Sequence, residues 1–210
     1  MNILYIRKGQ TMMAGRRRNI FSHESMVRID KTELTGSPKK NDDNNIMLKN
    51  RAETLEQKIE KYKTHPVQPG ICCIYTDGST YNNGRKNAKS GYGVFFGHMD
   101  IPPISRPVPP MEKQTNNVAE LMAIYAALEQ MKDKVEGKIR IYSDSNYSLD
   151  VITGKKQAHT NLELIARIKK LKSACRVPID FSHIYAHTDK QDQHSLGNDI
   201  ADYLAGLGSK

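Results

Sequence analysis

The chain has 210 residues, of which 38% are hydrophobic, and carries a formal net charge of +9 at pH 7. This length accommodates one ordinary domain plus an extension, and the apolar runs fall far short of the roughly 18–20 residues of a membrane span, so we expect a soluble protein. The three cysteines, Cys72, Cys73 and Cys175, fit neither a disulfide framework nor a zinc site, which favours an intracellular, reducing compartment such as cytoplasm or nucleus.

Residues 1–50 show no sustained periodicity and include a basic cluster at residues 16–18 and a polar run at residues 36–45. Such a stretch cannot bury enough apolar surface to offset its chain entropy, so we expect a basic, disordered tail. Five lysines and arginines precede Glu24, the first acid. A mitochondrial targeting segment, an arm that binds nucleic acid and a tail without a function of its own are all open interpretations.

Residues 51–70 predict a short helix followed by a linker. In the run RAETLEQKIEKYK, Leu55, Ile59 and Tyr62 fall on one helical face. The His-Pro and Pro-Gly pairs that follow are typical of a linker. The helix either packs on the main domain or only separates the tail from it.

A folded domain is expected over residues 71–210. Its expected elements are a strand at 71–76, a hairpin partner at 92–97, a proline-rich edge strand or irregular crossing at 101–110, a long helix from about 118, a strand at 138–143, helices at 145–153 and 162–174, a strand at 179–186 and a closing helix at 198–208. This order predicts a mixed α/β domain whose helices cover the faces of the sheet.

Four carboxylates occur in separate settings: Asp77 in IYTDGS, Glu120 in TNNVAEL, Asp144 in IYSDS and Asp202 in NDIADYLA. Asp77 and Asp144 end strand-like runs, and the other two lie on helix-patterned segments. Buried acids repel each other, so converging acids usually have a divalent cation between them. Mg²⁺ and Mn²⁺ prefer such oxygen ligands, and paired ions of this kind cut phosphodiesters. The four acids therefore indicate a nuclease, in a chain whose positive charge favours polyanions.

Each acid taken alone also has a structural explanation. Asp77, in its Asp-Gly pair, fits a turn, and Glu120 fits a capping box that reaches back to the backbone of Asn117. Asp144 fits the N-cap of the helix that follows, as do its serine neighbours. Asp202 fits the solvated face of the last helix. Four acids at strand ends and helix starts, where α/β sheets bind ligands, nevertheless favour a joint site.

Taken together, the motifs YTDGS, TNNVAEL, YSDS, AHT and GNDIADYLA resemble those of type 1 ribonuclease H, in that family's order and over residues 71 to about 208. The resemblance implies the RNase H-like fold, an α/β fold with a mixed five-stranded sheet and helices on its faces. It also implies an endonuclease that hydrolyses the RNA strand of RNA–DNA hybrids with two Mg²⁺ ions, for which Mn²⁺ can substitute, and leaves 5′-phosphate and 3′-hydroxyl ends. The partner that it implies is the hybrid duplex. We expect the protein to be a monomer that does not bind a membrane.

By the same resemblance, the catalytic and metal-binding carboxylates are Asp77, Glu120, Asp144 and Asp202. The family's Asn-x-x-x-Asp pattern aligns with Asn198 and Asp202 and leaves Asp199 at a non-ligand position. His187 in AHT matches the family's mobile histidine, which is proposed to help proton transfer or product release. The loop between His187 and Asp202 is longer than in well-known members, so His194 is a rival for that role.

The resemblance also implies residues that contact the substrate. Asn83, Asn116 and Asn117 match positions at the minor groove and the 2′-hydroxyls of the RNA strand, which an amide can both donate to and accept from. The residues that match a pocket for a phosphate of the DNA strand are Thr115, Lys113 and Asn161.

Two departures from the family concern how the hybrid is gripped. The chain has no tryptophan, and the segment between Gly154 and Asn161 is short, so the basic, tryptophan-containing protrusion of many cellular members is missing. We hypothesise that the basic tail partly replaces it. A reverse-transcriptase-associated ribonuclease H domain and a non-catalytic hybrid-binding protein are the alternative interpretations.

Overall fold

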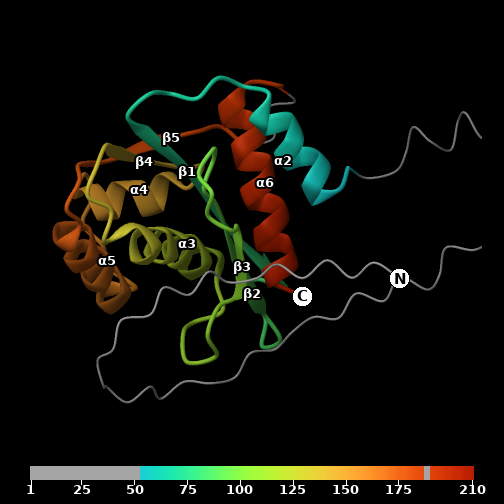
Figure 1. Ribbon diagram of the computed structural model, residues 1–210. Coiled ribbons are helices and arrows are strands. Elements are labelled where there is room, and N and C mark those ends of the chain that lie inside the picture. The colour runs from blue at the N-terminus through green and yellow to red at the C-terminus, as the bar shows by residue number, and fades with distance from the viewer. Residues whose placement is uncertain (1–52, 187–189) are drawn as a thin grey trace, which may run out of the picture. The chain divides into compact units, whose positions relative to one another are not determined.

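The computed structural model describes residues 53–186 and 190–210 (Figure 1). Its centre is one five-stranded sheet in the order β3-β2-β1-β4-β5, in which β1 pairs antiparallel with β2 and parallel with β4. The strands are β1 (Ile71–Tyr81), β2 (Lys89–Phe95), β3 (Ile104–Pro107), β4 (Lys138–Ser143) and β5 (Ile179–His183). The helices are α2 (Leu55–Lys63), α3 (Asn116–Met131), α4 (Asn146–Thr153), α5 (Leu162–Ala174) and α6 (Gln193–Gly208). The mixed five-stranded sheet expected from the sequence is confirmed.

Alternation along the strands builds a hydrophobic core on each face of the sheet. Ile74 of β1 belongs to a cluster with α3, α4 and α5, whereas its neighbours Cys73 and Tyr75 belong to a second cluster with α2 and α6, because successive side chains of a strand point to opposite faces. Figure 1 shows α3, α4 and α5 on one side of the sheet and α2 and α6 on the other. The sheet is therefore covered by helices on both faces, as predicted.

The parallel strands β1 and β4 separate just before two of the candidate acids. Their last pair is Tyr75 with Tyr142, and Asp77 and Asp144 each follow two residues later. Both acids therefore lie at the same level of the sheet, on the side of the carboxyl ends of two adjacent parallel strands.

β1 does not end at this point. It continues along β2 as far as Tyr81, with Asp77 opposite Gly93. The expected strand end at residue 76, with Asp77 in a turn, is therefore wrong. Hydrogen bonding to β2 keeps the Asp-Gly pair in extended backbone, although that dipeptide favours turns locally.

Glycines let two helices lie directly against the backbone of the sheet. A Cβ atom at Gly78 would overlap the backbone nitrogen of Glu120 on α3, and a Cβ atom at Gly93 would overlap the backbone oxygen of Ala201 on α6. No side chain fits at either position, because protein interiors are close-packed. The first approach brings Glu120 close to β1. The second brings α6 close to the sheet, and with it Asp202, which follows Ala201.

Helix α2 is the helix predicted within residues 51–63, and it packs against α6. Tyr62 is fully buried, and Leu55 and Ile59 are partly buried against the same cluster. Thr54 and Gln57 close the first turn with a capping box, in which each side chain bonds to the other residue's backbone N–H. Of the two interpretations of this helix, packing on the domain is therefore the one observed.

Most other elements follow the sequence patterns. α5 spans the predicted residues, α4 ends at Gly154 in the left-handed conformation, and the proline-rich stretch forms the edge strand β3. β5 ends at His183, earlier than the predicted residue 186. None of the helices in the described part of the chain combines the length and apolar character needed to cross a membrane.

Helix α6 begins at Gln193 rather than at the predicted residue 198. Asp192 caps it, since its carboxylate accepts hydrogen bonds from the backbone N–H groups of His194 and Ser195. The added turn contains polar residues and no apolar stripe of its own. Its helical state depends on this cap and on burial of Leu196, which periodicity alone does not reveal.

The close approach of α6 to β2 gives a stability prediction. Gly93→Ala should lower the free energy of unfolding by about 1–3 kcal/mol or more, because the new methyl group meets helix backbone that cannot move aside. Denaturant unfolding measures this change. Gly206→Ala, on α6 itself, is the control: nothing lies within 4 Å of its Cβ position, so it should be neutral or stabilising by up to about 1 kcal/mol. Equal effects of the two substitutions would contradict the proposed packing.

Candidate active site

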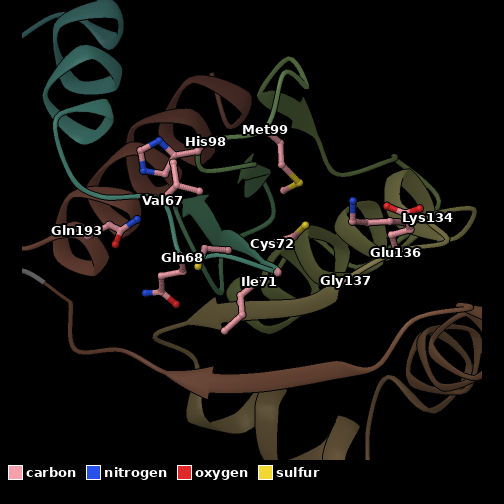
Figure 2. A pocket seen from close by; sticks show the side chains of 12 residues that line it. Val67, Gln68, Ile71, Cys72, His98, Met99, Lys134, Glu136, Gly137 and Gln193 are labelled. Atoms are coloured by element: carbon pink, nitrogen blue, oxygen red, sulfur yellow. The ribbon is translucent and has the colours of Figure 1, made fainter.

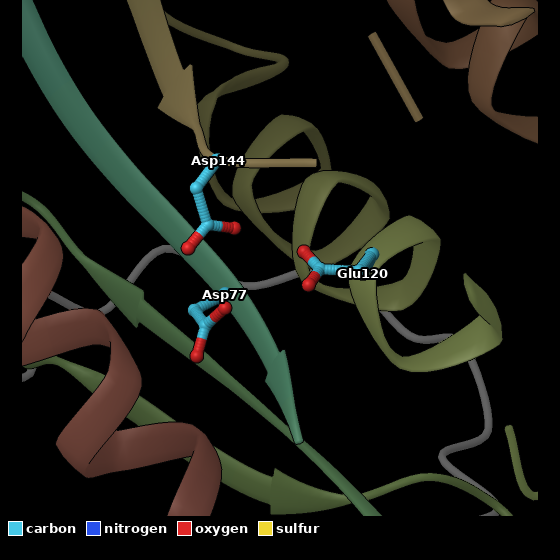
Figure 3. A group of neighbouring side chains, drawn as sticks. All are labelled: Asp77, Glu120 and Asp144. Atoms are coloured by element: carbon cyan, nitrogen blue, oxygen red, sulfur yellow. The ribbon is translucent and has the colours of Figure 1, made fainter. Parts of the chain in front are cut away.

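Three of the predicted carboxylates meet where β1 and β4 separate. Asp77 comes from β1, Glu120 from the second turn of α3, and Asp144 directly follows β4 (Figure 3). One ligand oxygen from each lies within 4.8 Å of the other two. Because each acid belongs to a different element, the group forms only when the chain is folded.

The nearby helix caps come from other residues. Thr115 caps α3 by accepting a backbone hydrogen bond in the first turn, while Glu120 is buried with 4% of its surface exposed. The capping-box interpretation of Glu120 is therefore wrong. Ser145, not Asp144, caps α4. Both acids thus point into the site rather than serving their own helices.

Burial and mutual repulsion make these acids costly to ionise. Burial raises the pKa of Asp77 to about 8, and the charges of Asp144 and Asp202 add to this effect. Burial likewise raises the pKa of Glu120 well above its ordinary value, with further repulsion from Asp77 and Asp144. The Glu120 Oε2 atom is buried and has no hydrogen-bond partner among the described residues. Such a group is stabilised by a cation placed between the oxygens.

Helix α6 places two further polar side chains beside this group, although Asp202 is not among the acids whose ligand oxygens lie within 4.8 Å of one another. Asp202 is exposed and shares a hydrogen bond with Asp77. One turn earlier, Asn198 is 3% exposed and bonds to Asp144, which opposes the effect of burial on the pKa of that acid. The Asn198 Oδ1 atom is buried without a partner in the described part of the chain. Both residues of the Asn-x-x-x-Asp pattern therefore face the acids from β1 and β4.

Comparison with known proteins identifies the family. The RNase H family model matches residues 69–210, most of the chain. This chain belongs to the ribonuclease H family. Ribonuclease H of Schizosaccharomyces pombe is 36% identical over 177 residues, which cover 76% of this chain and 62% of the relative. Ribonuclease H1 of Homo sapiens is 29% identical over 150 residues, which cover 65% of this chain and 49% of the relative. The chain thus spans less than two thirds of the length of either relative.

The fold also matches solved ribonuclease H structures. The crystal structure of LC11-RNase H1 in complex with an RNA/DNA hybrid has a TM-score of 0.52 and 24% identity, and the match covers 65% of this chain and 95% of that chain. Identity at this level supports the fold alone. The ribonuclease H fold expected from the motifs is therefore confirmed.

Of the two candidate histidines, His187 lies outside the described residues, so its role as the mobile histidine stays a prediction. His194 lies in the first turn of α6. Its Nδ1 atom is 3.0 Å from the hydroxyl of Tyr75 and its Nε2 atom 3.4 Å from the hydroxyl of Tyr142. Burial lowers its pKa. A ring held between two tyrosines suits a structural role better than a mobile one.

The predicted substrate contacts on α3 lie close to the acids. Asn116 and Asn117 are exposed in the first turn, just before Glu120. Thr115 is the half-buried N-cap of the same helix, and Lys113 is exposed two residues earlier. The two asparagines and two of the residues expected to bind the phosphate therefore lie together at the N-terminal end of α3.

The other two predicted contacts lie in connections between elements. Asn83 is exposed between β1 and β2. Asn161 adopts the left-handed conformation (φ 56°) immediately before α5, and its side chain makes no capping bond to that helix. Their contacts with nucleic acid stay predictions.

Sequence reasoning missed His183. This residue pairs with Ser143 at the end of β5, and its Nε2–H donates to the backbone oxygen of Asp144 at 3.2 Å. The sequence did contain a hint: when β4 and β5 pair in parallel, His183 at the end of β5 lies opposite Ser143, the residue before Asp144. Without the sheet order, however, nothing in the sequence makes these strands neighbours.

The buried acids make the stability of the metal-free protein depend on pH. Because the pKa of Asp77 is raised, the folded chain keeps a proton that the unfolded chain releases. The free energy of unfolding should therefore fall as the pH rises from about 4, the ordinary carboxyl value, to about 8. We expect a lower Tm in EDTA at about pH 8 than at about pH 5, and an increase on addition of Mg²⁺ at about pH 8. Circular dichroism during thermal unfolding measures both.

Asp77→Asn removes one of the charges at almost constant shape. It should stabilise the metal-free protein at about pH 8 by about 1–2 kcal/mol and remove most of the Mg²⁺-induced increase. If the asparagine variant kept the full Mg²⁺ effect, the assignment of Asp77 to the cation site would be wrong.

Proposed function

We propose that this chain is an endoribonuclease that hydrolyses the RNA strand of RNA–DNA hybrids and leaves 5′-phosphate and 3′-hydroxyl ends. The observation that carries the proposal is the group of three carboxylates, two buried and one half-buried, with ligand oxygens within 4.8 Å of one another, in a chain of the ribonuclease H family. The hybrid bound to LC11-RNase H1, which has the same fold, supports this substrate class.

The acids fit a site for hard divalent cations. All the candidate ligands are carboxylate oxygens, which suits Mg²⁺ or its substitute Mn²⁺. The Oε2 atom of Glu120 has no hydrogen-bond partner among the described residues, so it is available as a ligand. Asp77, Glu120 and Asp144 would hold one ion, and Asp77 with Asp202 would hold a second, more exposed one. When bound, such a pair lowers the pKa of an attacking water and stabilises the leaving 3′-oxygen.

Side chains around the acids would hold them in place for this chemistry. Asn198 bonds to the side chain of Asp144, and His183 holds the backbone oxygen of the same residue. Asp144 is thereby fixed from α6 and from β5. Partners of this kind orient metal ligands, and their loss typically lowers metal affinity or activity about 10–100-fold. His187 would help to move a proton or release the product.

The N-terminal end of α3 supports recognition of a hybrid. Asn116 and Asn117 are exposed amides, which can both donate to and accept from a 2′-hydroxyl, the group that distinguishes RNA from DNA. Lys113 and Thr115 lie where the free N–H groups and the dipole of the helix favour a phosphate. Asn83 would add a contact to the RNA strand, and Asn161 one to the phosphate of the DNA strand.

One cleavage assay tests the proposal. The chain should cut the labelled RNA strand of a hybrid in Mg²⁺ and not in EDTA, and it should spare the labelled DNA strand. Asp77→Asn should lower kcat by about 10³-fold or more, since metal ions contribute several kcal/mol to such a reaction. A wild-type protein that binds the hybrid in Mg²⁺ without cutting it would instead be the non-catalytic binder.

Two neighbouring acids on α6 provide a matched pair for the fourth ligand. Asp202→Asn should lower kcat strongly, because it removes a carboxylate that would hold the second, more exposed ion. Asp199→Asn is the control, because it makes the same chemical change three residues earlier, at a position that is not a metal ligand in the family's pattern. Similar losses in both variants would overturn the assignment of Asp202.

The role of the basic tail can be tested separately from α2. Deletion of residues 1–52 leaves the capping residue Thr54 and the whole of α2 in place. If the tail grips the hybrid, the deletion should raise KM and reduce the slope of log KM against log salt, because fewer counterions are released. An unchanged KM and slope would rule out this role for the tail.

A further inference from the structure

Helix α2 lies before the part of the chain that matches the family, yet it is built into the domain. The family model begins at residue 69, whereas α2 ends at Lys63. Tyr62, in its last turn, has no exposed surface. Its ring makes edge-to-face contacts with Tyr75, at 5.6 Å between centroids, and with Phe95, at 4.8 Å. The interior of the domain on this face is therefore completed by a residue from outside the matched segment.

A chain of hydrogen bonds connects Tyr62 to the start of α6. Gln193 Nε2 donates to the Tyr62 hydroxyl at 3.1 Å, and this hydroxyl is 3.1 Å from the hydroxyl of Tyr75. The Tyr75 hydroxyl is 3.0 Å from His194 Nδ1. His194 Nε2 is 3.4 Å from the hydroxyl of Tyr142. Gln193 and His194 are the first two residues of α6, so the network fixes the beginning of that helix to α2, β1 and β4.

One arrangement of protons satisfies this network. The Tyr62 hydroxyl donates to Tyr75, and the Tyr75 hydroxyl donates to the bare Nδ1 of a neutral His194. The remaining ring proton, on Nε2, then donates to Tyr142. Burial disfavours the charged form of His194, which agrees with this neutral state. The donors thus run in one direction, from Gln193 to Tyr142, and removal of the Tyr62 hydroxyl leaves Gln193 and Tyr75 without a partner there.

The same helix positions continue to the acids. His194, Asn198 and Asp202 are spaced by four residues, so they lie along one side of α6. Asn198 bonds to Asp144, and Asp202 shares a hydrogen bond with Asp77. Between the first two, Gly197 lies flat against the ring of Tyr75, where a Cβ atom would overlap the ring. The ring of Tyr75 therefore sets the distance of α6 from the sheet, and the hydrogen bonds of His194 set the rotation of α6 about its axis. Both determine where Asp202 lies.

Most of the link from α2 to β1 is exposed to solvent. A pocket of about 320 Å³ opens beside the link, with Val67, Gln68, His98 and Gln193 among its lining residues (Figure 2). Val67 is 63% exposed. The packed connection between α2 and α6 therefore runs through Tyr62 and the apolar residues on its face of the helix.

We propose that Tyr62 is a positioning residue of the cation site: through Tyr75 and the first turn of α6, it holds Asn198 and Asp202 at their places beside the acids of β1 and β4. This inference rests on the proposed function for the identity of the site. It adds that the site depends on a helix that precedes the family's matched segment.

Tyr62→Phe in the full chain is the test, because it removes only the hydroxyl and keeps the buried ring. Mg²⁺ affinity, measured by isothermal titration calorimetry, should fall roughly threefold to tenfold, less than the 10–100-fold typical of a direct partner of a metal ligand. At limiting Mg²⁺, kcat should fall with it, while KM for the hybrid stays the same, since no substrate contact is touched. Gln193→Leu breaks only the bond between Gln193 and Tyr62, so it should lower the affinity by no more than Tyr62→Phe does. The double variant should lose no more than Tyr62→Phe alone, because that substitution already breaks this bond.

Tyr92→Phe is the matched control. Tyr92 is also a buried tyrosine, with 6% of its surface exposed, but it belongs to the cluster on the other face of the sheet and bonds to Arg106. The Mg²⁺ affinity of the Tyr92→Phe variant should equal that of the wild type, even if the Tm of the variant is lower. A folded Tyr62→Phe variant with wild-type Mg²⁺ affinity, or an equal loss in Tyr92→Phe, would overturn the inference. Failure of the wild-type protein to cut a hybrid would instead contradict the proposed function, since Mg²⁺ binding is measured without substrate.

Discussion

Electrostatic repulsion among buried acids is the constraint on which the rest of this structure depends. Asp77 and Glu120 are buried and Asp144, which follows β4, is half-buried. The three acids are far apart in the sequence, and each would be more stable as a carboxylate in water. The fold holds them together through contacts between backbones, at Gly78 for α3 and at Gly93 for α6. A backbone contact cannot relax by a change of rotamer, so the repulsion is opposed by the most rigid parts of the domain.

The sequence alone predicted those features that are encoded within a few residues. Apolar and β-branched runs located β1, β2, β4 and β5, whereas the proline-rich stretch left an edge strand and an irregular crossing open for β3. The spacing of apolar residues located α5 to the residue. The motifs around Asp77, Glu120 and Asp144 indicated a joint acidic site, and the structure does bring these acids together. Alternation and periodicity are local properties, which explains this success.

Features that depend on distant partners were not predictable in the same way. The Asp-Gly pair in β1 favours a turn, and only pairing with β2 keeps it extended. The first turn of α6 needs the cap at Asp192 and the rings of Tyr75 and Tyr142. The same holds for His194, whose position in the sequence suggested a mobile loop. Its two tyrosine partners lie on β1 and β4, more than fifty residues away.

The backbone contacts at Gly78 and Gly93 also affect how the domain unfolds locally. Where side chains separate a helix from a sheet, the helix can shift by small steps while the sheet stays intact. Here α3 and α6 meet the backbone of β1 and β2 directly, so neither can move far without breaking the packing on its own face of the sheet. The central strands and these two helices should therefore exchange their amide hydrogens as one cooperative unit. The acids held by these elements would then come apart together when this unit opens.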